Sequence, residues 1–359
     1  MADEIRLSVG GKTYSGWESV EIVRSIEAVC ASFSLSVADP DTGSGRRAIR
    51  IAPGARAEIH VGQDLLLSGY VDAIEARLEA KDHSVRIEGR DLAGDLVDCV
   101  PLGLPSEFYD VEILDLAREL AAPFGVDVEL QDGVDPGRPF EIFSLRPTET
   151  AFEALERAIR ARGLLAQSTA DGTIVLSRAG SERASVEIAE GKNLYAVDRL
   201  RLDHSGRFRR YVVLGQRPGS DLAYGADVAE IQAEASDPIP RATRTLAIQA
   251  EGSVDDDAAA VLAVWWANVR AARGSSLVLS VQGWRQGGDR GLVWRPGVLV
   301  PVKIPRLEIL SDWLVAGVRL SRSIRSGSVA SLALVLPDSY LQEPPSPDRE
   351  PAFGSELEE

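Results

Sequence analysis

A similar β-rich passage occurs twice in this chain, once near each end, at 53–89 and at 296–336. Each copy opens with a Pro-Gly turn and continues with three segments of alternating apolar and polar residues, the pattern of β-strands. The offset between corresponding residues stays between 243 positions, for Gly54 and Gly297, and 247 positions, for Ile87 and Leu334. The chain is therefore expected to contain two similar β modules. Such a pair lets three subunits form a ring of six similar units.

Length and composition narrow the class of protein. A chain of 359 residues favours two or three domains, and 45% hydrophobic residues suffice for real cores. The net charge of −16 opposes binding to polyanions, although the stretch from Arg199 to Arg210 is locally basic. No apolar run approaches the length that crosses a bilayer, and the N-terminus lacks the pattern of a signal peptide.

The two cysteines, Cys30 and Cys99, form no disulfide framework. We therefore expect a protein that folds in the cytoplasm with buried thiols. A Cys30–Cys99 disulfide is the alternative.

The first hundred residues show strand patterns with frequent turns. Alternating segments such as Ile5–Val9 and Phe33–Val37 are separated by turn signals, among them Gly10-Gly11 and the segment 39–45. Several short strands without a helix predict a small barrel or sandwich.

A helical period begins after residue 110. Apolar residues fall on one face of a predicted helix between Ile113 and Ala121, which Pro123 ends. A second stripe runs from Phe152 to Ile159, after Thr148 as the expected N-cap. The Asp171-Gly172 pair predicts a hairpin with a two-residue turn. This part of the chain is expected to be a compact α+β module.

Strands return from about residue 185, and Tyr211–Gly215 is among the clearest. The segment 217–240 shows little periodicity and is predicted to be a long exposed loop. A helix is predicted from Ser253 and the acidic run Asp255–Asp257 to Gly274. The acids suit its N-terminus, and Arg270 and Arg273 suit its C-terminus. N-capping therefore explains the acidic run better than a cation site does.

This predicted helix carries a heavy apolar face, formed by Leu262, Trp265, Trp266 and Val269. Core packing is the expected role of such a stripe. A contact between subunits is the alternative, because large aromatic residues concentrate at interfaces.

Motifs of catalysis or cofactor binding are not found. Gly11-Lys12-Thr13 belongs to a phosphate-binding loop only if a glycine stands where Arg6 does, so a hairpin turn is the better interpretation. The histidines His60, His83 and His204 lie far apart and have no metal-ligand spacing. No nucleophile elbow occurs, and nothing singles out a glycosidase pair among the 55 acids. We therefore expect no enzyme, and no catalytic, cofactor-binding or metal-binding residue.

A family resemblance is carried by two motifs. These are Leu66–Asp72, which contains Gly69-Tyr70-Val71, and Val85–Cys99, which contains Gly89-Arg90-Asp91. Together they resemble the Mu-like family of phage tail proteins, which form the central baseplate hub of contractile tails and are related to the hub portion of type VI secretion spike proteins. Further similar stretches lie in the same order at 33–40, 121–126, 211–216, 266–273, 281–285 and 291–297. The resemblance covers roughly residues 5 to 341.

The resemblance implies a homotrimer with two tube-like β-barrel domains per chain. Six such domains would adapt a hexameric tail tube protein to a trimeric spike, nucleate tube assembly, and contact other baseplate proteins. Spike proteins of type VI secretion continue into a β-helix, whereas this sequence stops at residue 359 without such a repeat. The spike is therefore expected to be a separate chain. The acidic tail at 342–359 either engages that spike or is a solvated end.

Localisation and function follow from the same resemblance. We expect assembly in the host bacterial cytoplasm, a place in the tail baseplate of the virion, and no membrane insertion by the chain itself. DNA is expected to pass without specific binding through a neutral or acidic lumen. The alternatives are a tail-associated cell-wall hydrolase, and the equivalent hub of a non-contractile tail or a gene-transfer particle.

The expected fold class is α+β, mainly β, with two similar tube-type β-barrels and small α/β modules. The expected domains are a first barrel at 1–100, an α+β domain at 101–184, a second barrel at 185–240 and 286–341, a strand–helix–strand insert at 241–285 and a flexible tail at 342–359.

Overall fold

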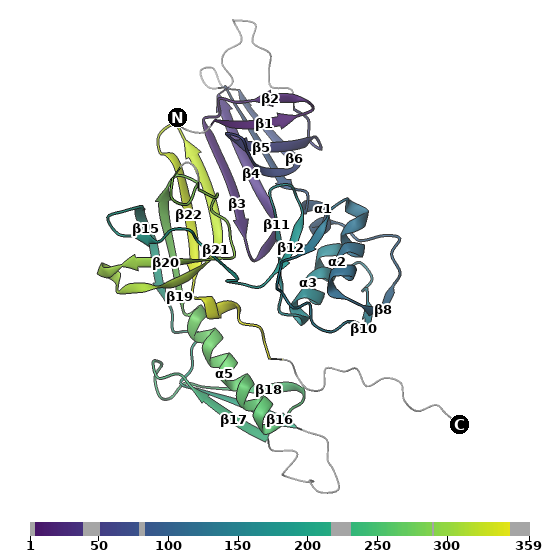
Figure 1. The fold of residues 1–359 in the computed structure, drawn as a ribbon, viewed down its shortest axis with the longest axis vertical. Helices are drawn as coiled ribbons and strands as arrows, with labels where there is room; N and C mark the ends of the chain where they lie inside the picture. Colours follow the sequence, from purple (N-terminus) through teal and green to yellow (C-terminus); the bar gives the residue numbers. More distant parts are fainter. Residues whose placement is uncertain (1–3, 39–50, 79–82, 217–230, 289–290, 345–359) are drawn as a thin grey trace, which may run out of the picture. The chain divides into compact units, whose positions relative to one another are not determined.

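The computed structural model describes residues 4–38, 51–78, 83–216, 231–288 and 291–344. Its contacts divide the chain into two compact units. The first comprises residues 1–198 and 278–334, and the second comprises 199–277 and 335–359. Strands predominate over helices along the chain, which confirms the mainly β class (Figure 1).

One large sheet dominates the first unit. Its order is β15-β19-β22-β21-β3-β4-β7-β6-β5-β1-β2, and β20 pairs with β21, β13 and β14. Its strands are β1 (Ile5–Val9), β2 (Lys12–Tyr14), β3 (Ser19–Ser25), β4 (Ala28–Ala38), β5 (Arg56–Val61), β6 (Asp64–Leu78), β7 (His83–Asp91), β13 (Glu182–Arg183), β14 (Ile188–Ala189), β15 (Leu194–Leu202), β19 (Ser275–Gln282), β20 (Val298–Ile304), β21 (Ile309–Ser323) and β22 (Gly327–Val335).

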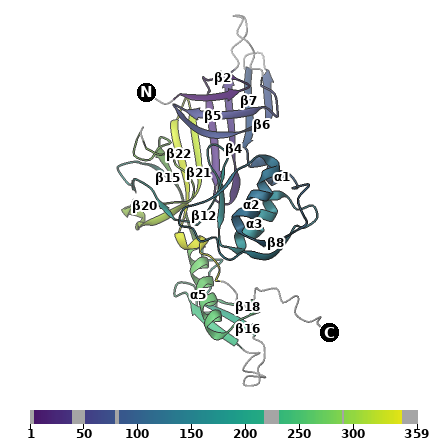
Figure 2. The ribbon, with the colours of Figure 1, turned by 45° about the vertical axis from the view of Figure 1, so that its right-hand side comes forward.

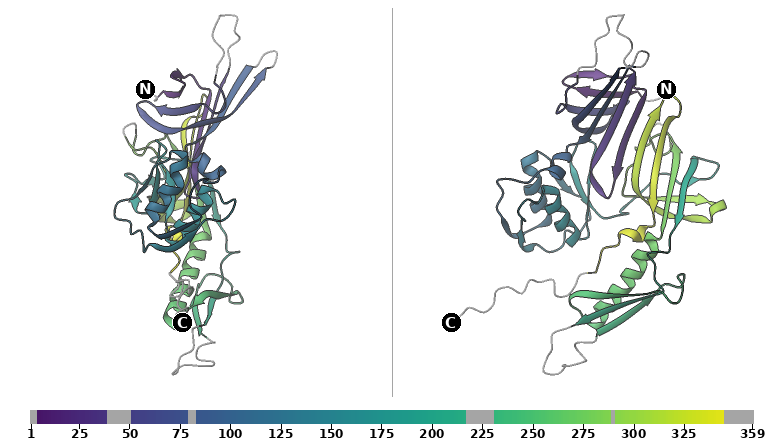
Figure 3. Two further views of the ribbon diagram at one scale, coloured as in Figure 1. Left: turned by 90° about the vertical axis from the view of Figure 1, so that its right-hand side faces the viewer. Right: turned by 180° about the vertical axis from the view of Figure 1, so that it is seen from behind.

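This sheet contains the same five-strand pattern twice. The first module has the order β3-β4-β7-β6-β5, and the second module has the order β15-β19-β22-β21-β20. Strands β6 and β21, which occupy the same place in the two modules, are both 15 residues long. The two modules adjoin where β3 pairs with β21, and the right panel of Figure 3 shows the purple and yellow strands next to each other. The duplication predicted from the sequence is therefore present in the topology.

The two Pro-Gly turns are equivalent in detail. Gly54 and Gly297 have φ angles of +81° and +84°, a region that side chains other than glycine rarely adopt. The amide of Gly54 donates to the carbonyl of Val71 at 2.7 Å, and the amide of Gly297 donates to the carbonyl of Val315 at 2.8 Å. Each turn thus ties the segment just before β5 or β20 to the long central strand of its module.

The sheet does not close on itself among the described residues. Its end strands β15 and β2 do not pair with each other. The two closed tube-type barrels expected from the sequence are therefore not seen in the single chain.

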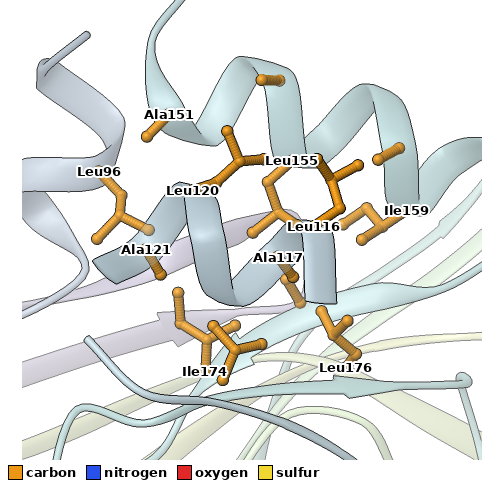
Figure 4. Close-up of a cluster of buried hydrophobic side chains, with 14 of the residues drawn as sticks. Leu96, Leu116, Ala117, Leu120, Ala121, Ala151, Leu155, Ile159, Ile174 and Leu176 are labelled. Carbon is orange, nitrogen blue, oxygen red and sulfur yellow. The ribbon is translucent and has the colours of Figure 1, made fainter. Parts of the chain in front are cut away.

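An α+β module completes the first unit, and Figure 2 shows its helices grouped together. Leucines and alanines of α2 and α3 pack on β12, as the close-up in Figure 4 shows. The helix α3 begins with a capping box, in which the Thr150 side chain accepts from the Glu153 amide and the Glu153 side chain accepts from the Thr150 amide. The elements are α1 (Gly94–Asp98), β8 (Glu107–Val111), α2 (Ile113–Ala121), η2 (Ala122–Phe124), β9 (Val128–Leu130), β10 (Phe140–Ser144), α3 (Ala151–Ala161), β11 (Leu165–Ser168) and β12 (Ile174–Ser177).

The second unit is a three-stranded sheet, in the order β17-β16-β18, with one long helix. Its core joins Val213 and Ile231 of the sheet to Ala259 and Ala263 of the helix. The segment after β22 lies on the same helix, where the Trp265 indole donates to the carbonyl of Leu341 at 3.0 Å. The elements are β16 (Arg210–Gln216), β17 (Ile231–Ser236), β18 (Thr245–Ser253), α5 (Asp256–Arg273) and η4 (Pro337–Tyr340), while η3 (Pro305–Leu307) belongs to the first unit.

The two glycines of the family motifs lie where β6 and β7 approach each other closely. A Cβ atom on Gly69 would lie 1.9 Å from the carbonyl oxygen of Arg90. A Cβ atom on Gly89 would lie 2.0 Å from the carbonyl oxygen of Tyr70 and 2.5 Å from the ring of Phe33. Only glycine therefore fits at either position of this crossing.

The charged residues of the same motifs connect neighbouring elements. Asp91 is buried and accepts from the amides of Ala31 at 2.8 Å and Ala93 at 3.0 Å, and from the hydroxyl of Ser168. Its carboxylate thus joins β7 to β4, to the turn before α1, and to β11. The neighbouring Arg90 donates to Asp98 at 2.6 Å and to Asp72 at 2.9 Å, and these bonds raise its pKa.

Several local predictions are confirmed. Gly10-Gly11 forms the hairpin turn between β1 and β2, with Val9 opposite Lys12. The helix predicted after residue 110 is α2, and the helix predicted after the Asp255–Asp257 run is α5, with Gly274 as its C-cap. The Asp255 side chain accepts from the Ala258 amide at 2.8 Å, so N-capping accounts for the start of the run.

Other local predictions are wrong. Thr150 rather than Thr148 caps α3, because Thr148 has a φ of +68° and stands outside the helix. The β11–β12 hairpin has a loop at 169–173 instead of a two-residue turn, since Ser168 pairs with Ile174. Ser253 lies in β18, and Asp255 is the N-cap of α5.

Three further expectations need correction. The strand at Tyr211–Gly215, which we grouped with the second barrel, is β16 and pairs with β17 and β18. The predicted loop at 217–240 contains β17, and its part at 217–230 lies outside the described residues, as do the turn at 39–45 and the tail from 345. The expected thiol burial fails, because Cys30 is half-buried and Cys99 is exposed, and both are free. The domain boundaries stay predictions.

The apolar face predicted for α5 is buried only in part. Val269 is buried, whereas Trp265 and Trp266 are half-buried. Alanines form most of the buried stripe, namely Ala259, Ala263, Ala267 and Ala272. The expected core packing is thus confirmed for Val269, whereas Trp265 and Trp266 lie at the edge of the buried stripe.

Substituting Gly89 by alanine should destabilise the chain by about 3 kcal/mol, because the new methyl group would overlap backbone and ring atoms. Urea unfolding measures this loss. Gly94→Ala is the matched control, since a Cβ atom there lies 3.5 Å from Arg90, an ordinary contact. Equal midpoints for the two variants would contradict the close crossing.

Substituting Asp91 by alanine should cost about 3 kcal/mol, because two buried amides and one hydroxyl lose their acceptor. Ser168→Ala removes one donor and leaves the carboxylate its two amides, so it should cost about 1 kcal/mol. Thermal unfolding compares the two variants. A smaller loss for Asp91→Ala than for Ser168→Ala would show that the carboxylate is not the organising group.

Candidate functional site

The outer edge of β15 is open. This strand ends the large sheet, and among the described residues only β19 pairs with it. Its side chains include exposed apolar groups, with Tyr195 at 68% and Leu202 at 67% of full exposure. A nine-residue edge with apolar side chains is a template for pairing with another strand.

A second open edge lies on β6. Strand β7 pairs with β6 from Gly69 to Leu78, but β5 covers the opposite edge only from Asp64 to Tyr70. The stretch 73–78 therefore has one edge without a partner strand among the described residues. Most side chains of this stretch are exposed.

The duplication explains both edges. In the second module the corresponding part of the central strand, Gly317–Ser323 of β21, is covered by β3 in antiparallel pairing. The strand that corresponds to β3 is β15, and the strand that corresponds to β21 is β6. The two open edges are thus the two halves of a junction that already exists once inside the chain.

The existing junction shows what such pairing offers. Ile22 of β3 is buried opposite Leu320 of β21, also buried. The guanidinium of Arg319 donates to Glu21 at 2.9 Å across the two strands. Backbone bonds continue beyond the ladder, since the amide of Ile26 donates to the carbonyl of Ala316 at 2.9 Å.

The residues weighed for catalysis are not gathered into a site. His60 lies on β5, His83 opens β7 and His204 follows β15. The His60 ring nitrogen lies 3.4 Å from Glu58. Among the described residues, no group of three or more His, Cys, Asp or Glu side chains is placed to hold a metal ion.

The first unit contains a pocket of about 460 Å³. It lies among Ile22 of β3, Gln167 of β11 and Trp294. Glu182 is the one carboxylate among the described residues that line it, and it pairs with Arg295. A single paired carboxylate does not provide the two acids of a glycosidase. This pocket therefore gives no support to the cell-wall hydrolase alternative.

In the described part of the chain, no helix combines the length and apolar character needed to span a membrane.

The open edges were missed from the sequence, because the pattern of β15 reads like any other strand. The nearest signal in the sequence is the repeat itself. The offset of the repeat does not extend to β15, because β16, β17, β18 and α5 are inserted between β15 and β19.

Three family models together match most of the chain. Residues 4–91 match the N-terminal domain of Mu phage baseplate assembly protein GpP-like proteins. Residues 93–178 match the second domain of baseplate hub protein gp44-like proteins, and residues 257–343 match the fourth domain of Mu phage baseplate assembly protein GpP.

Similar proteins and structures agree with these models. A 43 kDa tail protein of prophage MuSo2 from Shewanella oneidensis has a TM-score of 0.82 and 27% identity, covering 95% of this chain and 100% of that one. A tail protein from Neisseria meningitidis has a TM-score of 0.74 and 22% identity over 95% and 99% of the chains. A type VI secretion system component of Escherichia coli shares the fold at a TM-score of 0.55 and 11% identity, over 92% and 76% of the chains.

A curated phage protein is also similar in sequence. The chain is 30% identical over 352 residues to the baseplate hub protein gp44 of Escherichia phage Mu, covering 95% of this chain and 90% of that protein. With the matched domains and the MuSo2 structure, this shows that the chain belongs to the Mu-like family of phage baseplate hub proteins.

Proposed function

We propose that the chain is the trimeric hub of a contractile-tail baseplate, in which three copies form a ring with six similar β modules. Family membership supports the place in the baseplate of a phage tail. The observation that carries the finer proposal is the pair of open edges on β15 and β6, which repeats the internal β3–β21 junction.

Ring closure follows from the symmetry of the modules. If β15 of one copy pairs with the 73–78 stretch of the next, every junction in the ring is of the β3–β21 type. Three internal and three intersubunit junctions then alternate around a threefold axis. Such head-to-tail contacts close into a ring when the rotation between units fits. The joined sheets form the tube-type barrel that one chain does not form alone.

The ring would act as a symmetry adapter. Its six modules present a near-sixfold face to a hexameric tail tube, and its true threefold symmetry matches a trimeric spike carried by a separate chain. Other baseplate proteins would surround it. Three copies carry a formal charge of −48, three times −16, which supports passage of DNA through the lumen without specific binding.

Structural relatives also support a role in assembly instead of catalysis, since the matched proteins are named as baseplate or tail components. Neighbouring genes for a contractile sheath would separate this proposal from the hub of a non-contractile tail or gene-transfer particle.

The purified chain should form trimers whose fraction rises with concentration, because edge pairing is an intermolecular equilibrium. Analytical ultracentrifugation measures the mass, and a low-resolution image should show a threefold ring with a central hole. A chain that stays monomeric at high concentration, with tube or spike protein present, would contradict the proposal.

Proline at 76 or 77 tests the β6 edge. Backbone amides of successive residues point to opposite edges of a strand. One of the two substitutions, Ala76→Pro or Arg77→Pro, therefore removes an amide donor on the open edge, and the other removes a donor to β7. The variant that lacks the open-edge donor should keep its unfolding temperature within a few degrees and lose most of its trimer. The other should be destabilised by about 3 kcal/mol, because it breaks the ladder to β7.

Arg77→Ala is the matched control and should leave both mass and stability unchanged. Trimers that persist in both proline variants would show that this edge takes no part in the ring.

A further inference from the structure

Four arginines gather around one pocket of about 490 Å³ in the second unit. Arg199 and Arg201 come from the end of β15, two residues apart and so on the same face of the strand. Arg270 and Arg273 come from the last turn of α5. The basic stretch that begins at Arg199 thus lies around the same pocket as Arg270 and Arg273. From the sequence, those two arginines were explained only by the helix dipole.

Three of these arginines have no carboxylate partner among the described residues. Arg201 pairs with Asp203, and this bond holds the pKa of Asp203 well below its usual range. Arg199 makes no hydrogen bond or ion pair in the part of the chain that the structure describes. Arg270 donates to the carbonyl of Gly206 at 3.2 Å, and Arg273 donates to the carbonyl of Ser339 at 3.2 Å.

Arg270 is held in place by aromatic rings. Its guanidinium lies 5.0 Å from the ring centre of Trp266 and 5.7 Å from that of Phe208. Its Nε atom is buried and has no hydrogen-bond partner in the described structure. The guanidinium is therefore held by ring contacts and one backbone carbonyl, without a carboxylate partner among the described residues.

The backbone fixes the distance between the two arginine pairs. The amide of Asp203 donates to the carbonyl of Gly274 at 2.7 Å, which joins the end of β15 to the end of α5. A Cβ atom on Gly274 would lie 2.8 Å from the Cδ atom of Arg207, so this close approach favours glycine. The backbone positions that carry the arginines are therefore set before any ligand arrives.

The helix dipole does not account for this arrangement. The C-terminal end of α5 is negative, which explains arginines in its last turn but disfavours an anion beside it. Arg199 and Arg201 belong to a strand and lie outside that explanation. In a chain with a net charge of −16, three arginines without a carboxylate partner mark a site for negative charge.

We propose that this pocket binds the carboxylates of an acidic peptide, and that the segment from Glu343 onward in the same chain is that peptide. Residues 343–359 contain six acids and one arginine, Arg349. The chain just before them is fixed on the helix that carries Arg270 and Arg273, through the bonds to Leu341 and Ser339. This tether gives the segment a high effective concentration at the pocket.

The test uses the full chain with its six tail acids changed to amides, at positions 343, 348, 350, 356, 358 and 359. A synthetic peptide of residues 343–359 should bind this neutral-tail chain in calorimetry, and roughly tenfold more weakly at high salt because charges are screened. The unmodified chain should bind the peptide at least about tenfold more weakly than the neutral-tail chain, because its own segment competes.

Variants in the neutral-tail chain locate the site. Arg199→Ala and Arg270→Ala together should weaken peptide binding roughly tenfold or more, since each removes a charge-assisted contact. Arg241→Ala is the matched control, because Arg241 is exposed in the same unit and does not line the pocket. An equal loss of peptide affinity in the double variant and in the Arg241→Ala control would overturn the assignment of the site.

Two further results would also overturn the proposal. Equal affinity of the peptide for the unmodified and neutral-tail chains would show that the segment does not occupy the pocket. A single-stranded DNA oligonucleotide that displaces the peptide and binds more tightly would make the pocket a phosphate site. None of these outcomes depends on trimer formation, so failure here is distinguishable from failure of the hub proposal.

Discussion

The close crossing of β6 and β7 is the constraint on which the rest of the first unit depends. Gly69 and Gly89 let the two backbones approach within a distance that no side chain permits. The side chains of Arg90 and Asp91, directly after this crossing, make different contacts. Arg90 donates to two exposed carboxylates, and Asp91 accepts hydrogen bonds from β4 and β11 in the buried interior. One short motif therefore sets strand spacing and positions the α+β module, which is a physical reason for its weight in the family resemblance.

Duplication turns this local geometry into an assembly property. A single module of five strands would leave open edges at both sides, and the chain covers one such pair internally by placing β3 on β21. The other pair, on β15 and β6, stays open among the described residues, which contain no third module. An exposed strand edge is an aggregation hazard unless another chain covers it. The proposed ring of three copies would cover both edges with a junction of the kind that the chain already contains.

The charge distribution separates two parts of the protein with different tasks. In the proposed hub, the acidic chain as a whole suits a conduit to which DNA does not adhere, whereas the arginine pocket of the second unit concentrates positive charge in one place. The separate pocket of the first unit has one carboxylate among its described lining residues, Glu182, and this carboxylate pairs with Arg295. In the proposed hub, the molecule acts through surfaces and symmetry, and the matched relatives are named as baseplate or tail components.

The sequence alone determined the repeat, the mainly β class, the helices α2 and α5, and the family. Period, turn residues and glycine motifs are local properties, and local properties are readable from residue order. Other features depended on tertiary structure. Thr150 replaced Thr148 as a cap because the backbone at Thr148 turned left-handed. Strand β16 pairs with β18 instead of the large sheet, and Arg199 lines the same pocket as Arg270. Contacts between such distant segments depend on tertiary packing, which cannot be read from the local sequence pattern.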